Sequence, residues 1–202
     1  MIRQLDHVVF VAHDLAAAVE EYRGRGFTVT PGGEHADGIT GNALVAFADG
    51  AYLELVGFRE PAPQHRWWNH ARTGGFADFA ALSDDLDADV AALGALVTRP
   101  GVDGGRTRPD GVRLRWRTAL LAPPLPFLIE DLTPRDRRVP SGDAARHANG
   151  TAGIASVVVG CRDLEAAERA YARMRERGGP KVVLRASASD GVEEIRYVGG
   201  ER

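Results

Sequence analysis

The segment Leu-Asp-His-Val-Val-Phe-Val-Ala-His-Asp-Leu, residues 5–15, decides the fold because the chain contains two further versions of it. Residues 76–86 read Phe-Ala-Asp-Phe-Ala-Ala-Leu-Ser-Asp-Asp-Leu, and residues 154–164 read Ile-Ala-Ser-Val-Val-Val-Gly-Cys-Arg-Asp-Leu. Aligning the Asp-Leu pairs places the second copy 85 − 14 = 71 residues and the third copy 163 − 14 = 149 residues after the first. Recurrence of this kind is typical of a repeated structural unit.

An alanine-rich helical pattern follows each Asp-Leu pair. The aspartates Asp14, Asp85 and Asp163 precede these helices, and an aspartate in that position can accept hydrogen bonds from the free backbone N–H groups of a helix start. Three strand candidates follow the first helix, beginning with a short one at 27–30. The second copy has a weakly marked strand near 96–98 and clearer ones at 112–118 and 127–132, whereas the third copy ends after two short strands.

This pattern predicts an α+β fold in which paired βαβββ modules form a cupped mixed β-sheet with the helices outside. The first module is expected at residues 1–58 and the second at 76–132. Residues 153–202 are expected to form an incomplete third module or an accessory tail. Segment 59–75 links the two modules. Segment 133–152, which contains prolines and glycines, links the tail and is the better candidate for a real boundary.

Composition narrows the classes of partner. The chain has 202 residues, a net charge of −3 and a pI near 6.1, so no basic surface for nucleic acid is expected. No apolar stretch approaches the ~20 residues that a membrane span needs. The single cysteine, Cys161, ends an apolar run, which favours burial over catalysis. One thiol cannot form an internal disulfide, and the first residues show no signal-peptide pattern, so a cytoplasmic protein is expected.

Several motifs carry a resemblance to a known family. In the first module they are the run 5–15, His35 followed by Gly41-Asn42-Ala43-Leu44, and Tyr52-Leu53-Glu54-Leu55. In the second they are Ala77-Asp78-Phe79, Arg108-Pro109-Asp110-Gly111, and Leu125-Pro126-Phe127-Leu128-Ile129-Glu130. Over roughly residues 1–160 the chain resembles glyoxalase-like proteins of the vicinal oxygen chelate superfamily, which includes glyoxalases, bleomycin-resistance proteins and dioxygenases. The superfamily contains enzymes of several reaction types and non-catalytic drug-binding proteins, so the fold alone does not give the function.

The resemblance implies a divalent metal ion, one of Zn, Mn, Ni, Fe or Co, held by His7, Glu54, Asp78 and Glu130. The repeat offset independently aligns His7 with Asp78, since 7 + 71 = 78. A carboxylate that shares a strand face with apolar residues is costly unless it is paired or bound to a cation. The plain alternative for each residue is a satisfied histidine of the core or rim, or a glutamate that faces solvent. Asp78 departs from the family pattern, which more often has His or Gln there.

A metal at this position would act on a carbonyl or enolate oxygen, with Glu130 or Glu54 as the catalytic group that moves a proton, helped by a pKa raised through burial. The expected activity is that of an isomerase, epimerase or lyase. The alternative is a metal-free protein that sequesters a small ligand such as a drug. The two classes differ in the metal content of the purified protein.

Five further residues are candidates for binding the substrate: His35, Asn42, Trp67, Trp68 and Arg115. His35 and Asn42 lie in or beside a glycine-rich loop. The tryptophans either stack on a ligand or cap the core. Arg115 faces the cup only if the arginines of strand 112–118 point inward, and the opposite orientation places them in solvent. The resemblance also implies a small-molecule partner and a homodimer.

Overall fold

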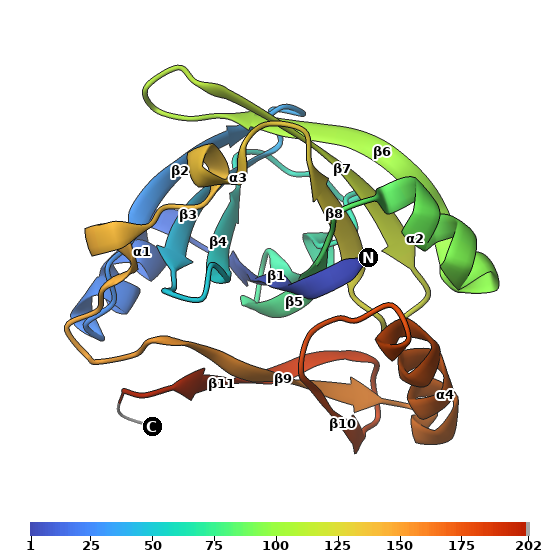
Figure 1. The fold of residues 1–202 in the computed structure, drawn as a ribbon. Helices are drawn as coiled ribbons and strands as arrows, with labels where there is room; N and C mark the ends of the chain where they lie inside the picture. The colour runs from blue at the N-terminus through green and yellow to red at the C-terminus, as the bar shows by residue number, and fades with distance from the viewer. Residues whose placement is uncertain (201–202) are drawn as a thin grey trace.

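Eight strands close into a barrel, and a second sheet covers part of its outer surface (Figure 1). The computed structural model describes residues 1–200. The barrel order is β1-β4-β3-β2-β6-β7-β8-β5, so each half contains the four strands of one module. The first half consists of β1 (Ile2–Ala12), β2 (Thr30–His35), β3 (Thr40–Ala46) and β4 (Tyr52–Phe58). The second half consists of β5 (Gly75–Ser83), β6 (Val97–Thr107), β7 (Arg113–Leu121) and β8 (Phe127–Asp131).

The helices begin where the repeated Asp-Leu pairs predict. They are α1 (Leu15–Gly24), α2 (Leu86–Leu93) and α4 (Leu164–Arg175). Each preceding aspartate accepts a hydrogen bond through Oδ1 from a backbone N–H three residues on. The distances are 3.1 Å for Asp14, 2.9 Å for Asp85 and 2.9 Å for Asp163. The predicted N-caps are therefore confirmed.

The first strand after each of the first two helices differs from the sequence-based expectation. β2 begins at Thr30, where residues 27–30 were expected, and Phe27 is buried in the connection before it. A bulge between Pro31 and Gly33 interrupts its pairing with β3. A Cβ at Gly33 would lie 2.0 Å from the carbonyl oxygen of Thr107 on β6, so only glycine permits this approach where the two halves join. β6 is also far longer than the strand expected near 96–98. The prediction was too short because glycines within the strand obscure its apolar pattern.

Strand alternation gives the barrel two distinct faces. Outward side chains such as Val8, Leu53 and Phe79 belong to the main hydrophobic core, which lies under the helices and the second sheet. Inward side chains such as Val9 and Ala80 form a smaller apolar cluster inside the barrel. The barrel interior is therefore lined partly by apolar groups and leaves room for polar ones.

The third copy forms its own sheet in the order β10-β9-β11, from β9 (Gly153–Cys161), β10 (Val182–Ala186) and β11 (Gly191–Val198). This sheet packs beneath β1 and β5 (Figure 1). Val157 and Cys161 are fully buried in the main core, which confirms the expected burial of the thiol. Residues 201–202 of the expected tail lie outside the described residues. Among residues 1–200, no helix has the length and apolar character needed to cross a membrane.

Candidate functional site

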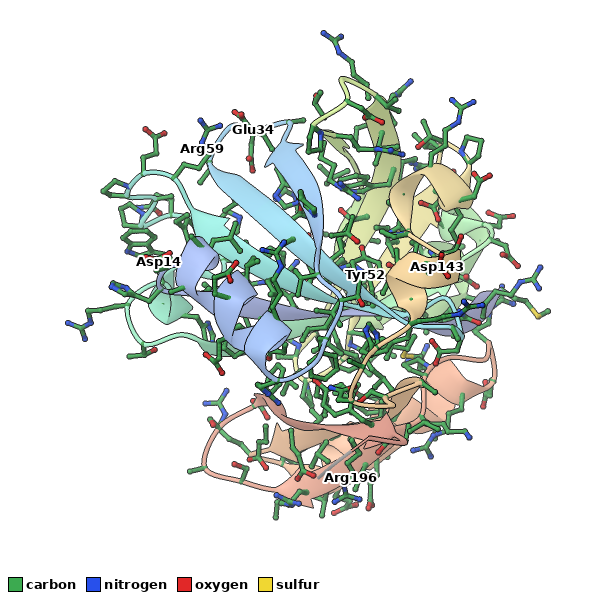
Figure 2. The ribbon with its side chains drawn as sticks, turned by 90° about the vertical axis from the view of Figure 1, so that its left-hand side faces the viewer. Asp14, Glu34, Tyr52, Arg59, Asp143 and Arg196 are labelled. Atoms are coloured by element: carbon green, nitrogen blue, oxygen red, sulfur yellow. The ribbon has the colours of Figure 1, made fainter. Side chains whose placement is uncertain are left out.

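The barrel encloses a cavity of about 240 Å³. Its mouth and floor lie at opposite ends of β4. Figure 2 places Glu34 and Arg59, which form an ion pair, at one end, and Tyr52 near Asp143 at the other. The segment containing Asp143 follows β8 and includes α3 (Arg135–Arg138), which crosses the floor end. The volume is below the roughly 300–1,000 Å³ typical of drug-sized ligands, so the cavity suits a smaller molecule.

Glu54 is the centre of the polar side of the cavity and is 5% exposed. Its Oε2 lies 3.3 Å from His7 Nε2, and its Oε1 lies 3.3 Å from His35 Nε2. Asn42 Nδ2 donates a hydrogen bond of 2.5 Å to Oε1. Burial raises the pKa of Glu54, but the hydrogen bonds from His35 and Asn42 and the charges of His7 and His35 outweigh it and lower the pKa from 4.5 to about 2. The group is therefore a stabilised carboxylate, and the expectation of a pKa raised by burial was wrong.

Each imidazole also forms a contact through its second ring nitrogen, Nδ1. His7 Nδ1 lies 2.5 Å from Asp6 Oδ1, and His35 Nδ1 lies 2.7 Å from Thr40 Oγ1. The pairing of β1 with β5 shifts register between Leu5 and His7, so regular alternation does not hold where Asp6 approaches the ring. The site thus presents the Nε2 atoms of both histidines toward one carboxylate. Which ring nitrogens carry protons depends on the tautomer.

Asp6 is held by the segment that follows β8. Arg138 is buried and donates to both Asp6 oxygens at 3.0 and 2.7 Å and to the hydroxyl of Tyr52 at 2.7 Å. It also pairs with Asp131, and Arg135 reaches Asp6 as well. Burial raises the pKa of Asp6, but the charge of Arg138 and the hydrogen bonds from His7 and Arg138 keep it well below the usual value. The segment expected to be a linker therefore completes the floor of the cup.

The second module lacks the counterpart of Glu54. Glu54 lies opposite Val9 in the β1–β4 pair, and Phe127 lies opposite Ala80 in the β5–β8 pair. Because the repeat offset aligns Val9 with Ala80 (9 + 71 = 80), Phe127 takes the position of Glu54. Its ring lies in the cavity, with its centroid 5.4 Å from that of His7.

The four expected metal ligands do not come together. Glu130 is three residues beyond Phe127 and on the other face of β8. It accepts from the backbone N–H of Leu86 at 3.4 Å and lies 3.7 Å from Arg117, so it contributes neither a ligand nor a catalytic group to the cavity. Asp78 pairs with Arg66 and accepts from Trp67 Nε1 at 3.1 Å. Among residues 1–200, no group of three or more His, Cys, Asp and Glu side chains has the arrangement of a metal site. The expected donor set does not fit a metal.

The expected substrate-binding residues divide into two groups. His35 and Trp67 line the cavity, and Asn42 acts through Glu54. Trp68 lies against Phe58, with ring centroids 5.0 Å apart, and does not line the cavity. Arg115 has a side chain that is 66% exposed, because the inward positions of β7 are occupied by its neighbours in the alternation.

Sequence reasoning missed several residues that form the site. His65 lines the cavity, and burial lowers its pKa. Arg106 and Arg138 also line it. Asp6 stood next to a candidate ligand in the Leu-Asp-His motif, and this adjacency was the only local signal. Arg106 and Arg138 come from a glycine-rich strand and from a presumed linker, where nothing in the pattern marks them.

The closed barrel of two βαβββ modules around a partly polar cup defines the vicinal oxygen chelate fold and confirms the predicted fold class. The family model described as "Glyoxalase-like domain" matches residues 5–174, and the chain belongs to that family. No curated protein matches the sequence.

Solved structures extend the likeness in fold. A hypothetical protein from Staphylococcus aureus is similar with a TM-score of 0.72 and 12% identity, over 93% of this chain and 87% of that chain. A hypothetical protein from Bacillus halodurans is similar with a TM-score of 0.50 and 14% identity, over 65% and 96%. Methylmalonyl-CoA epimerase from Streptomyces coelicolor, solved as a variant with 2-nitronate-propionyl-CoA, has a TM-score of 0.49 and 23% identity, over 66% and 100%. These similarities concern the fold alone.

Proposed function

We propose that this protein is an isomerase or epimerase that transfers a proton at a carbon next to a carbonyl group of a small molecule. The observation that carries the proposal is the pair of imidazoles on one buried carboxylate. His7 Nε2 and His35 Nε2 each lie 3.3 Å from a different oxygen of Glu54. Such reactions need one group that removes a proton and another that returns one, and histidine is the side chain best suited to both at neutral pH.

Glu54 serves this pair as a fixed negative charge. Its pKa near 2 makes it a weak base at neutral pH, so it does not itself remove the proton. It stabilises whichever imidazole has become protonated, and Asp6 stabilises His7 from the other side. The aspartate of a Ser-His-Asp triad orients a histidine and stabilises its imidazolium in the same way.

The proposal is tested by proton exchange in D2O. Pyruvate and phenylpyruvate serve as probes, and loss of the signal of the C–H next to the carbonyl is followed by proton NMR. Wild-type protein is expected to accelerate exchange above the buffer rate. His7→Gln and His35→Gln should each lower the protein-dependent rate by about 100-fold or more, the usual contribution of a general acid or base.

His13→Gln is the matched control. His13 lies on the same stretch as His7, but its ring is exposed and forms a hydrogen bond with the carbonyl oxygen of Ala71, at 3.2 Å. Its exchange rate should equal that of the wild type. If the protein binds a ligand in the cavity but does not accelerate proton exchange of either probe, the proposal fails. The alternative, a metal-free ligand-binding protein, then replaces it. The cytoplasmic location and the homodimer remain predictions from the sequence.

A further inference from the structure

Arg106 is a buried cation without a carboxylate partner. The residue is 4% exposed and lines the cavity. Its guanidinium donates to two neutral acceptors, the carbonyl oxygen of Gly32 and, at 2.8 Å, that of Arg138. Among residues 1–200, no carboxylate oxygen lies within 4.0 Å of its nitrogen atoms. A buried charge without a counter-ion is costly, so an unbalanced guanidinium at a cavity wall indicates that something else balances it.

The two other arginines that line the cavity already have carboxylate partners. Arg138 is paired with Asp6 and Asp131, and Arg66 is paired with Asp78. Glu54 is a negatively charged group of the same cavity, but its two oxygens already face two imidazoles and an amide. Arg106 is therefore the cation of the cavity wall whose partner is not found among residues 1–200.

The remaining walls of the cavity are flat aromatic surfaces. Tyr52, Trp67, Trp116 and Phe127 all contribute to the lining. The ring of His35 lies edge-on to that of Trp116, with centroids 6.2 Å apart. β2 and β6 pair His35 with Arg106, so the two residues are neighbours on the cavity wall. Aromatic walls favour planar ligands that stack or make edge-to-face contacts.

We propose that the cavity binds a small planar molecule bearing one carboxylate, and that Arg106 is the residue that holds the carboxylate. This inference rests on the proposed function only in assigning the substrate to the same cavity. The carboxylate supplies the missing counter-ion, and the planar fork of a guanidinium matches it in two parallel hydrogen bonds. The cavity of about 240 Å³ limits the molecule to roughly the size of a single ring with short substituents.

Three probes separate charge from shape. Benzoate is planar and negative, benzamide has the same shape without the charge, and cyclohexanecarboxylate has the charge without the planar ring. Binding is measured by isothermal titration and by quenching of tryptophan fluorescence. Wild-type protein is expected to bind benzoate at least tenfold more tightly than either of the other probes.

Variants of Arg106 test whether this residue recognises the carboxylate of benzoate. Arg106→Gln should bind benzoate and benzamide equally, and Arg106→Lys should keep part of the preference because it keeps the charge without the fork. Arg115→Gln is the matched control, since Arg115 is exposed on the outer face of β7. It should behave as the wild type. If Arg106→Gln does not fold, the nitrogen-15 signal of the Arg106 Nε–H in wild-type protein is followed instead and should shift on addition of benzoate.

Several results would overturn the inference. They are equal affinity of the wild type for benzoate and benzamide, absence of benzoate binding, a preference for benzoate that survives Arg106→Gln, or an Arg106 signal that does not move. A different result would contradict the proposed function. Wild-type protein that binds benzoate with the expected preference but does not accelerate exchange of pyruvate or phenylpyruvate would contradict the proposed function and leave the inference on Arg106 standing.

Discussion

Replacement of Glu54 by glutamine should remove a defined part of the acid sensitivity of folding. The pKa of Glu54 is about 2 in the folded protein, against an ordinary value of 4.5. Because the folded pKa is the lower one, the carboxylate stabilises the fold fully above pH 4.5, and this stabilisation is lost as the pH falls toward 2. The full shift corresponds to about 3.4 kcal/mol, of which about 1.4 kcal/mol is lost between pH 7 and pH 3.5.

The free energy of unfolding of both proteins is measured by urea denaturation at intervals between pH 7 and pH 3.5. Glu54→Gln keeps the size of the side chain but has no charge to lose. The difference between wild type and variant should therefore shrink by about 1.4 kcal/mol across this range. Glu20→Gln, on the exposed side of α1, is the control and should run parallel to the wild type, because exposed ion pairs contribute little. A constant difference for Glu54→Gln would refute the assignment of a lowered pKa to this carboxylate.

Three further substitutions test the packing around the site. Asp6→Asn should destabilise the protein by about 3–5 kcal/mol in urea denaturation, because it weakens a buried ion pair with Arg138, whereas Asp84→Asn, which breaks an exposed pair, should cost under about 1 kcal/mol. Met174→Ala should lower the free energy of unfolding by about 2–5 kcal/mol if α4 is part of the main core, while Val183→Ala on the exposed edge should stay within about 0.5 kcal/mol; equal effects would contradict this packing. Asp85→Ala should cost about 0.5–2 kcal/mol through loss of the N-cap of α2, and a neutral result would show that the cap contributes nothing.

The repeated Asp-Leu pairs predicted the fold because they report local physics. An apolar strand followed by an N-capping aspartate favours a strand-to-helix turn, and the structure has three such turns, before α1, α2 and α4. His7 and Glu54 were identified through the resemblance and their apolar strand faces, and His35 and Asn42 through the glycine-rich loop. These four residues are close together in the structure. Trp67 was also among the residues expected to contact a ligand, and it lines the cavity.

The predictions that were wrong or incomplete concern strand register, strand orientation and contacts between residues far apart in the chain. The resemblance implied Glu130 as a ligand, but the register of β8 against β5 turns Phe127 inward. The orientation of Arg115 could not be chosen from the sequence, since alternation fixes which residues share a face and not which face is inside. Arg138 reaches Asp6 across 132 positions of chain, and no local pattern reports such a contact.

The unequal halves of the barrel separate two tasks that a symmetrical barrel would combine. The first half contributes His7, His35 and Glu54, while the second contributes Arg106 and Phe127. If the first half handles protons and the second selects the molecule, substitutions in the second half can redirect the protein toward a new compound while leaving the proton-handling groups in place. Relatives of this chain would then be expected to diverge in preference through β6, β7 and β8, and an engineer seeking a changed specificity would begin there.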